Sequence, residues 1–235
     1  MRVLITRPEE DARGLAEKLS AMGIESRIEP LMTITDTGEA PSLSGVAALL
    51  FTSANGVRAF ARASDVRDVS VLAVGDATAR AAQTAGFAGV ETAGGDVHAL
   101  AALVKKTRNP ADGALLHVAG TQVAGDLAGL LSDAGFTCHR AVLYEAQAAT
   151  GLSAETASAL ADGVFAGVLF YSPRTASLFA DLVGGEVGAL AKMTAYCLSD
   201  AVAEKASALG WGRVAVASTP DETALLEILA KDAVA

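Results

Sequence analysis

The chain has 235 residues, a formal net charge of −9, and a composition that is 51% hydrophobic but only 5% aromatic. This length suits two domains of about 100 to 150 residues each, and a core of Ala, Val and Leu favours a soluble α/β protein. The negative charge, the lack of Lys or Arg runs and the lack of long apolar stretches argue against nucleic-acid and membrane partners and a signal peptide, so we expect a cytoplasmic protein.

Strand and helix patterns alternate along the whole chain. Turn residues separate the pairs, whereas the stretch 31–47 shows no periodicity and is interpreted as a connection. Boundaries are expected near residues 35 and 148. The predicted elements lie at 2–6, 12–19, 24–30, 48–62, 71–86, 89–92, 97–106, 115–135, 138–147, 167–181, 194–211, 213–219 and 220–230.

One sequence pattern occurs twice. Residues 49–60 read LLFTSANGVRAF and residues 168–179 read VLFYSPRTASLF, each an apolar run followed by a polar turn and a helical pattern. Further matches relate 71–87 to 195–211 and 15–25 to 127–137, so five elements recur. We therefore expect two doubly wound lobes with five parallel strands each and ligand sites beyond the carboxyl ends of the strands, in a cleft between the lobes.

The first candidate turn follows the strand at 2–6. Thr6 and Glu9 have the spacing of a helix capping box, which would explain both residues without a ligand. Capping does not require Arg7, whose guanidinium could pair either with a ligand carboxylate or with a surface acid.

The duplicated turn supplies two sets of candidates for binding polar or anionic groups. Each set also suits a plain helix N-cap, and Ser172 followed by Pro173 predicts an N-cap directly. Backbone N–H groups at helix starts attract anions, so we expect ligand contacts there. The candidates are Thr52, Ser53, Asn55 and Gly56 in the first copy, and Ser172 and Arg174 in the second.

Gly75 and Thr78, with Ser199 in the second copy, form a third pair of strand-end turns. Tyr144 stands in an extended segment that leaves the middle of the chain. Its hydroxyl could donate a proton to a leaving oxygen, and interface packing is the competing interpretation.

Other reactive residue types show no functional spacing. Cys138 and Cys197 lie in apolar runs and are expected to be reduced core residues, and His98, His117 and His139 are interpreted as incidental. Neither G-x-G-x-x-G nor the phosphate-loop motif occurs, so we expect no nucleotide, metal or other cofactor.

These motifs together resemble the uroporphyrinogen-III synthase family over nearly the whole chain. The resemblance rests on the order and spacing of LITRPEEDARGLAEKL, LLFTSANGVRAF, VGDATARAAQTAGF, LLHVAGTQVAGDLAGLLSDAGF, VLYEAQ, VLFYSPRTASLF and STPDETALLEIL.

The resemblance implies an exchange of elements between the two copies. Residues 1–34 and 148–235 would form one flavodoxin-like lobe, residues 35–147 an inserted second lobe, and two extended strands would link them. It also implies a cofactor-free lyase of tetrapyrrole and heme biosynthesis. Such an enzyme closes the linear polycarboxylate hydroxymethylbilane to uroporphyrinogen III through azafulvene and spiro intermediates, with ring D inverted.

The resemblance makes Tyr144 the candidate proton donor. Family members often have Arg-Gly where this chain has Ala119-Gly120, so Gly120 is expected to contact substrate through its backbone. The chain is expected to be a monomer with a small-molecule substrate. The alternative is a binding or sensor protein of the same fold without catalysis.

Overall fold

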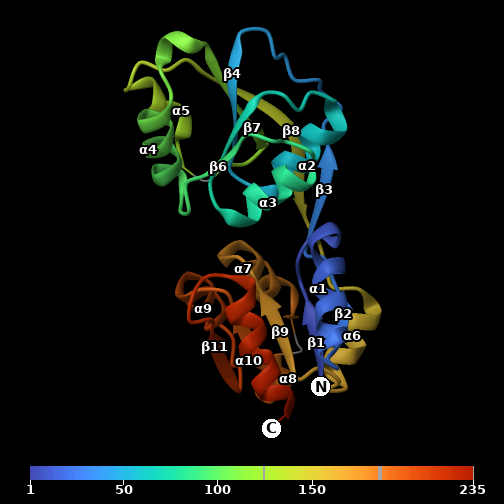
Figure 1. Ribbon diagram of the computed structural model, residues 1–235. Helices are drawn as coiled ribbons and strands as arrows, with labels where there is room; N and C mark the ends of the chain where they lie inside the picture. The colour runs from blue at the N-terminus through green and yellow to red at the C-terminus, as the bar shows by residue number, and fades with distance from the viewer. Residues whose placement is uncertain (124, 185–186, 235) are drawn as a thin grey trace. The chain divides into compact units, whose positions relative to one another are not determined.

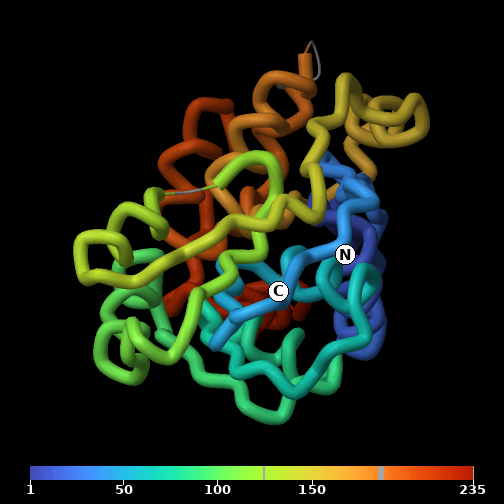
Figure 2. Tube along the Cα trace, turned by 90° about the horizontal axis from the view of Figure 1, so that it is seen from above, coloured from blue at the N-terminus to red at the C-terminus, as the bar shows by residue number. Residues whose placement is uncertain are grey.

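The computed structural model describes residues 1–123, 125–184 and 187–234, and the chain divides into two compact units. Unit 1 contains Met1–Thr33 and Gln147–Ala235, and unit 2 contains Ile34–Ala146. The two ends of the sequence, dark blue and yellow to red in Figures 1 and 2, therefore belong to unit 1, and the middle of the chain, from lighter blue through green, forms unit 2.

Unit 1 has a five-stranded sheet in the order β11-β10-β9-β1-β2, in which every described strand pair is parallel. Strand β1 pairs with β2 on one side and with β9 on the other, so the strand order reverses between β1 and β9. The strands are β1 (Arg2–Ile5), β2 (Glu25–Ile28), β9 (Gly167–Phe170), β10 (Thr194–Cys197) and β11 (Arg213–Val216).

Alternating side chains of β1 divide the core of unit 1 into two layers. Val3 and Ile5 pack toward α1 (Glu9–Ala21) and α10 (Glu222–Val234), whereas Leu4 packs toward the opposite face. The helices of that opposite face are α6 (Ala154–Ala161), α7 (Pro173–Leu182), α8 (Val187–Leu190) and α9 (Asp200–Ala206). The sheet is thus covered on both faces, as a parallel sheet of apolar strands requires.

Unit 2 has a six-stranded sheet in the order β3-β8-β7-β4-β5-β6. Its strands are β3 (Met32–Asp36), β4 (Val46–Phe51), β5 (Ser70–Ala73), β6 (Val90–Thr92), β7 (Ala114–Gly120) and β8 (Cys138–Ala148). The five-strand prediction is wrong for this unit, because β3 forms inside the stretch that the sequence marks as a connection. An edge strand with one neighbour needs little apolar alternation, so its pattern is weak.

Helices cover both faces of the second sheet as well. Helices α2 (Ala54–Ala63) and α3 (Asp76–Thr84) pack on the face that includes Leu49 and Phe51. Helices α4 (Val97–Thr107) and α5 (Leu127–Ser132) pack on the face that includes Leu50, and a short 3₁₀ helix η1 (Pro110–Asp112) precedes β7. The α/β class predicted from the sequence is confirmed, with sheets in which parallel strand pairs dominate.

The two sheets share one strand order once β3 is set aside. Strands β2, β1, β9, β10 and β11 correspond in turn to β8, β7, β4, β5 and β6, in agreement with the sequence matches. In unit 2 the order therefore reverses between β7 and β4. In doubly wound sheets ligands bind beyond the carboxyl ends of the strands at this switch point.

A buried carboxylate ties together two distant segments of unit 1. Glu29 follows β2 and accepts hydrogen bonds from the backbone N–H of Ser153 at 2.7 Å, from its hydroxyl at 2.7 Å, and from the Thr156 hydroxyl at 2.6 Å. Burial alone would raise the pKa of Glu29, but the bonds from Thr156 and Ser153 and the charge of Arg27 outweigh it, so the pKa is lowered. Ser153 also caps α6, a helix that is missing from the elements predicted from sequence.

The capping box predicted for Thr6 and Glu9 is wrong. Helix α1 begins after Pro8 without a side-chain cap, because the Thr6 hydroxyl donates to the carbonyl of Leu169 instead. Helix α10 starts at Glu222 and its first turn is closed by Asp221, which accepts from the N–H of Ala224. None of the helices within the described residues has the length and apolar character needed to cross a membrane.

Replacing Glu29 by Gln should lower the free energy of unfolding at pH 7 by roughly 1 to 3 kcal/mol, because a charged acceptor with three hydrogen bonds is lost. The lowered folded-state pKa means that this stabilisation is present above the unfolded value of about 4.5 and is lost as pH falls through the folded value. Urea unfolding at several pH values measures the free energy of unfolding of both proteins. The difference in this free energy between wild type and Glu29→Gln should become smaller in acid. Glu25→Gln on the exposed side of β2 is the control, and an unchanged difference in acid would contradict the assignment.

Candidate functional site

The polar turn after β4 is joined to Tyr144 by a hydrogen bond. The hydroxyls of Ser53 and Tyr144 lie 2.9 Å apart, and Ser53 Oγ also accepts from the N–H of Gly56 at 3.2 Å as the N-cap of α2. Only 8% of Tyr144 is exposed, so its ring packs in the core while its hydroxyl reaches the carboxyl edge of the sheet. Two residues 91 positions apart thus meet at the switch point of unit 2.

An irregularity in β8 directs the Tyr144 ring. The register between β7 and β8 shifts between Ala119 and Gly120, so that Leu143 and Tyr144 both pack in the layer beneath α2 and α3. Two successive side chains on one face are the mark of a β-bulge, which re-aims a side chain. A Cβ at Gly120 would lie 2.7 Å from Cε2 of Tyr144, so the ring position requires glycine there.

The second hydroxyl of the turn has its own partner on β7. Thr52 Oγ1 lies 3.1 Å from Nε2 of His117, a buried residue of that strand. Burial and the charge of Arg140 lower the pKa of His117 to about 4, so its imidazole is neutral at neutral pH. The Thr52-Ser53 turn is therefore held by two side-chain hydrogen bonds, one to β7 and one to β8.

Arg140 fixes the chain where β7 ends. One terminal nitrogen of its guanidinium donates to the carbonyl oxygens of Gly120 and Thr121, the latter at 2.9 Å. The N–H of Thr121 in turn donates to the carbonyl of Tyr144 at 3.0 Å. Gly120 and Tyr144 are consequently held in place by their backbones as well as by ring packing.

The remaining predicted residues of unit 2 are placed around this turn. Gly56 lets α2 approach β7, since a Cβ would lie 3.0 Å from the carbonyl oxygen of Val118. The Asn55 side chain accepts a hydrogen bond from Arg58 in the same helix. Gly75 is the N-cap of α3, and no neighbouring atom lies within 4 Å of the place where a Cβ would stand. Thr78 is a buried residue of the first turn of α3.

In unit 1 the predicted residues are engaged within the protein. Thr6 is fully buried, with its hydroxyl 2.7 Å from the carbonyl oxygen of Leu169. Arg7 forms ion pairs with Glu222 at 3.0 Å and Asp11 at 3.5 Å, and its guanidinium carbon lies 4.2 Å from the centre of the Tyr171 ring. Arg7 therefore forms salt bridges within unit 1, and its pairing with a ligand carboxylate stays a prediction.

The other strand-end residues of unit 1 lie at helix starts. Ser172 is the N-cap of α7, as predicted, and accepts from the N–H of Thr175 at 3.1 Å. Arg174 is exposed in the first turn of α7. Ser199 precedes α9 and forms no side-chain cap.

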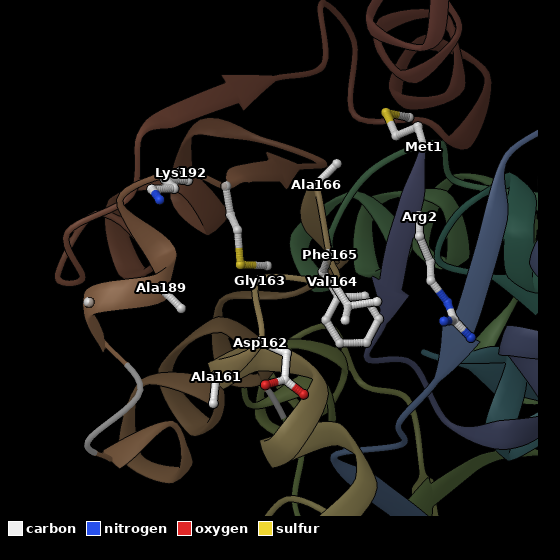
Figure 3. A pocket seen from close by; sticks show the side chains of 12 residues that line it. Met1, Arg2, Ala161, Asp162, Gly163, Val164, Phe165, Ala166, Ala189 and Lys192 are labelled. Carbon is white, nitrogen blue, oxygen red and sulfur yellow. The ribbon is translucent and has the colours of Figure 1, made fainter.

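A cavity of about 700 Å³ in unit 1 lies at the other edge of the sheet. It is lined by residues at the starts of β1 and β10 and after α6, with Arg2, Asp162 and Lys192 among them (Figure 3). It contains no residue predicted for the site. Within the described parts of the chain, no group of three or more His, Cys, Asp or Glu side chains is placed to hold a metal ion.

The structure therefore brings together the predicted residues Thr52, Ser53, Gly120 and Tyr144 with two that were missed, His117 and Arg140. His117 sits in an apolar strand pattern, and nothing in its neighbours along the chain indicates a partner 65 residues earlier. The contact of His117 with Thr52 follows from the pairing of β4 with β7. It could be predicted only if the order of the strands in the sheet were known.

A family model described as uroporphyrinogen-III synthase HemD matches residues 13–227. No curated protein matches the sequence. A crystal structure of uroporphyrinogen-III synthetase from Helicobacter pylori 26695 is similar at 18% identity with a TM-score of 0.69, over 98% of this chain and 99% of that one.

A mutant uroporphyrinogen III synthase from the extremely thermophilic bacterium Thermus thermophilus is similar at 17% identity with a TM-score of 0.57, over 100% of this chain and 98% of that one. At these identities the two structures show a shared fold, whereas the family match covers most of the sequence. The chain belongs to the uroporphyrinogen-III synthase family.

Proposed function

We propose that the chain converts hydroxymethylbilane to uroporphyrinogen III, with inversion of ring D and loss of water, and that the switch point of unit 2 supplies the proton donor. The observation that carries the proposal is the Tyr144 hydroxyl, held 2.9 Å from Ser53 at the carboxyl edge of a doubly wound sheet in a member of this family.

The first step needs a proton at a departing hydroxyl. Electrons from a pyrrole nitrogen expel the terminal hydroxyl group as the Tyr144 phenol gives up its proton, so that water and an azafulvene form. Ser53 remains as a hydrogen-bond donor to the phenolate oxygen that is left. The Gly120 and Thr121 backbone fixes Tyr144 during this step.

The later steps require orientation more than chemistry. The substituted α-carbon of ring D attacks the azafulvene to give a spiro intermediate, which fragments and recloses with ring D inverted. The proton lost when ring D regains its aromaticity restores the phenol, so water is the sole by-product. The Thr52-Ser53 turn is fixed by bonds to His117 on β7 and to Tyr144 on β8. Such a rigid site suits this task, because it can bring one carbon of ring D, rather than its neighbour, to the azafulvene.

Freshly prepared hydroxymethylbilane incubated with the protein should give mainly uroporphyrinogen III. Isomer analysis of the oxidised porphyrins by chromatography measures this directly. The protein-free reaction closes to the symmetric isomer I, so a predominance of isomer I with protein present would favour the non-catalytic alternative.

Replacing Tyr144 by Phe should lower kcat for isomer III by roughly 100-fold or more, since the proton donor is lost while the ring is kept. Stopped assays at saturating substrate measure the change. Tyr196→Phe is a matched control, because its hydroxyl bonds Asp232 in unit 1 and lies away from the carboxyl edge. A Tyr144→Phe variant with wild-type kcat would remove the proton-donor role and leave the reaction itself standing.

Replacing Gly120 by Ala should reduce isomer III turnover on the order of 100-fold, because the new Cβ would displace the Tyr144 ring from its bond with Ser53. Gly89→Ala is the control, since no neighbouring atom lies within 4 Å of the Cβ position there. Circular dichroism would verify that both variants fold. Equal turnover of the two variants would show that the contact between Gly120 and Tyr144 does not matter for the reaction.

A further inference from the structure

A polyanionic substrate needs positive charge, and Arg7, one of the two cations expected from the sequence, is paired within the protein. Arg7 is neutralised by Glu222 and Asp11, and Glu222 is shared with Lys18. With a net charge of −9 the protein as a whole repels anions. Besides the backbone N–H groups at helix starts, attraction for substrate carboxylates must therefore come from a local, uncompensated cation.

Arg140 is such a cation at the carboxyl edge of unit 2. The residue is exposed, and no carboxylate pairs with it among residues 1–123, 125–184 and 187–234. Its hydrogen-bond partners there are two backbone carbonyls, which leave its full positive charge in place. The arginines Arg62, Arg108 and Arg213, by contrast, each pair with an aspartate or glutamate.

The strand register explains how the guanidinium reaches this edge. Arg140 pairs with His117 in the β7–β8 ladder, three residues before Gly120, and its long side chain extends along the strands to the Gly120 and Thr121 carbonyls. Both side chains meet at Gly120: the Arg140 guanidinium bonds its carbonyl oxygen, and the Tyr144 ring lies where a Cβ of this residue would stand.

The guanidinium also keeps donors available. Both described bonds use a single terminal nitrogen, and an arginine has five N–H groups in a planar fork that suits a carboxylate. Because the carbonyl bonds fix the orientation of the fork, little conformational entropy would be lost when an anion binds.

We propose that Arg140 binds a carboxylate side chain of the linear tetrapyrrole and thereby sets the affinity of the unit 2 edge for substrate. This inference rests on the proposed function. Position 119 carries no cation in this chain, and Arg140 supplies one from the neighbouring strand to the same strand end. The role assigned to Arg140 is in substrate binding.

Arg140→Gln removes the charge and, because its side chain is shorter, gives up the bonds to the Gly120 and Thr121 carbonyls. Tyr144 stays held by the N–H of Thr121 and by its packing against Gly120. The KM of this variant for hydroxymethylbilane should rise about tenfold or more, while kcat and the share of isomer III stay within about twofold of wild type. Arg140→Lys, which retains the charge, should recover most of the affinity. Raising the salt concentration should increase the wild-type KM and change that of Arg140→Gln much less.

Lys106→Gln is the matched control for loss of one positive charge. Lys106 is exposed in the last turn of α4, a helix that leads from β6 back to the start of β7 and so ends at the amino edge of the same sheet. Its KM should remain that of wild type.

Two results would overturn the proposal. An unchanged KM in Arg140→Gln shows that no carboxylate binds there, and a fall in kcat with more isomer I shows that Arg140 only positions Gly120 and Tyr144. If wild type itself gives isomer I, the proposed function fails instead. Binding of the octacarboxylate uroporphyrin I then decides for Arg140: a tenfold weaker Kd in Arg140→Gln than in Lys106→Gln supports the site, and equal values reject it.

Discussion

The parallel pairing of β1 with β9 is the interaction on which unit 1 depends. Val3, Leu4 and Ile5 pair with Gly167, Val168 and Leu169, and so join the first residues of the chain to a segment more than 160 positions later. A side chain at Gly167 would collide with the Thr194 carbonyl and the Tyr196 ring, so the central strands can approach only because glycine stands there. Without this pairing the two segments of unit 1 would each be an incomplete sheet with unpaired backbone groups.

The corresponding pairing in unit 2, between β4 and β7, creates the site. Both sheets reverse their order at this pairing, and both carry polar residues beyond it. Duplication nevertheless gave the two switch points different chemistry. At the position where unit 2 has Thr52 bonded to His117, unit 1 has Tyr171, whose ring lies against the guanidinium of Arg7. That guanidinium forms an ion pair with Glu222.

The unit 2 edge combines rigid hydroxyls with the positive charge of Arg140. Ser53 and Thr52 are each held by a buried partner, and the chain at Gly120 is held by Arg140. Preorganised donors of this kind cost little reorganisation when a ligand binds, which suits a reaction whose outcome depends on which of two carbons is held in place. The bulge at Leu143 and Tyr144 is part of this arrangement, because regular alternation would turn the tyrosine ring to the other face.

The sequence by itself determined the α/β class, the internal duplication and the polar turns at 52–56 and 172–175, because periodicity and turn chemistry are local properties. The tertiary structure decided what those turns contact. The bonds of Thr52 with His117 and of Ser53 with Tyr144 join residues 65 and 91 positions apart. The ion pair of Arg7 with Glu222 joins residues 215 positions apart. Such contacts follow from strand order and from a one-residue bulge in register, and neither leaves a mark on the residues nearby in the chain.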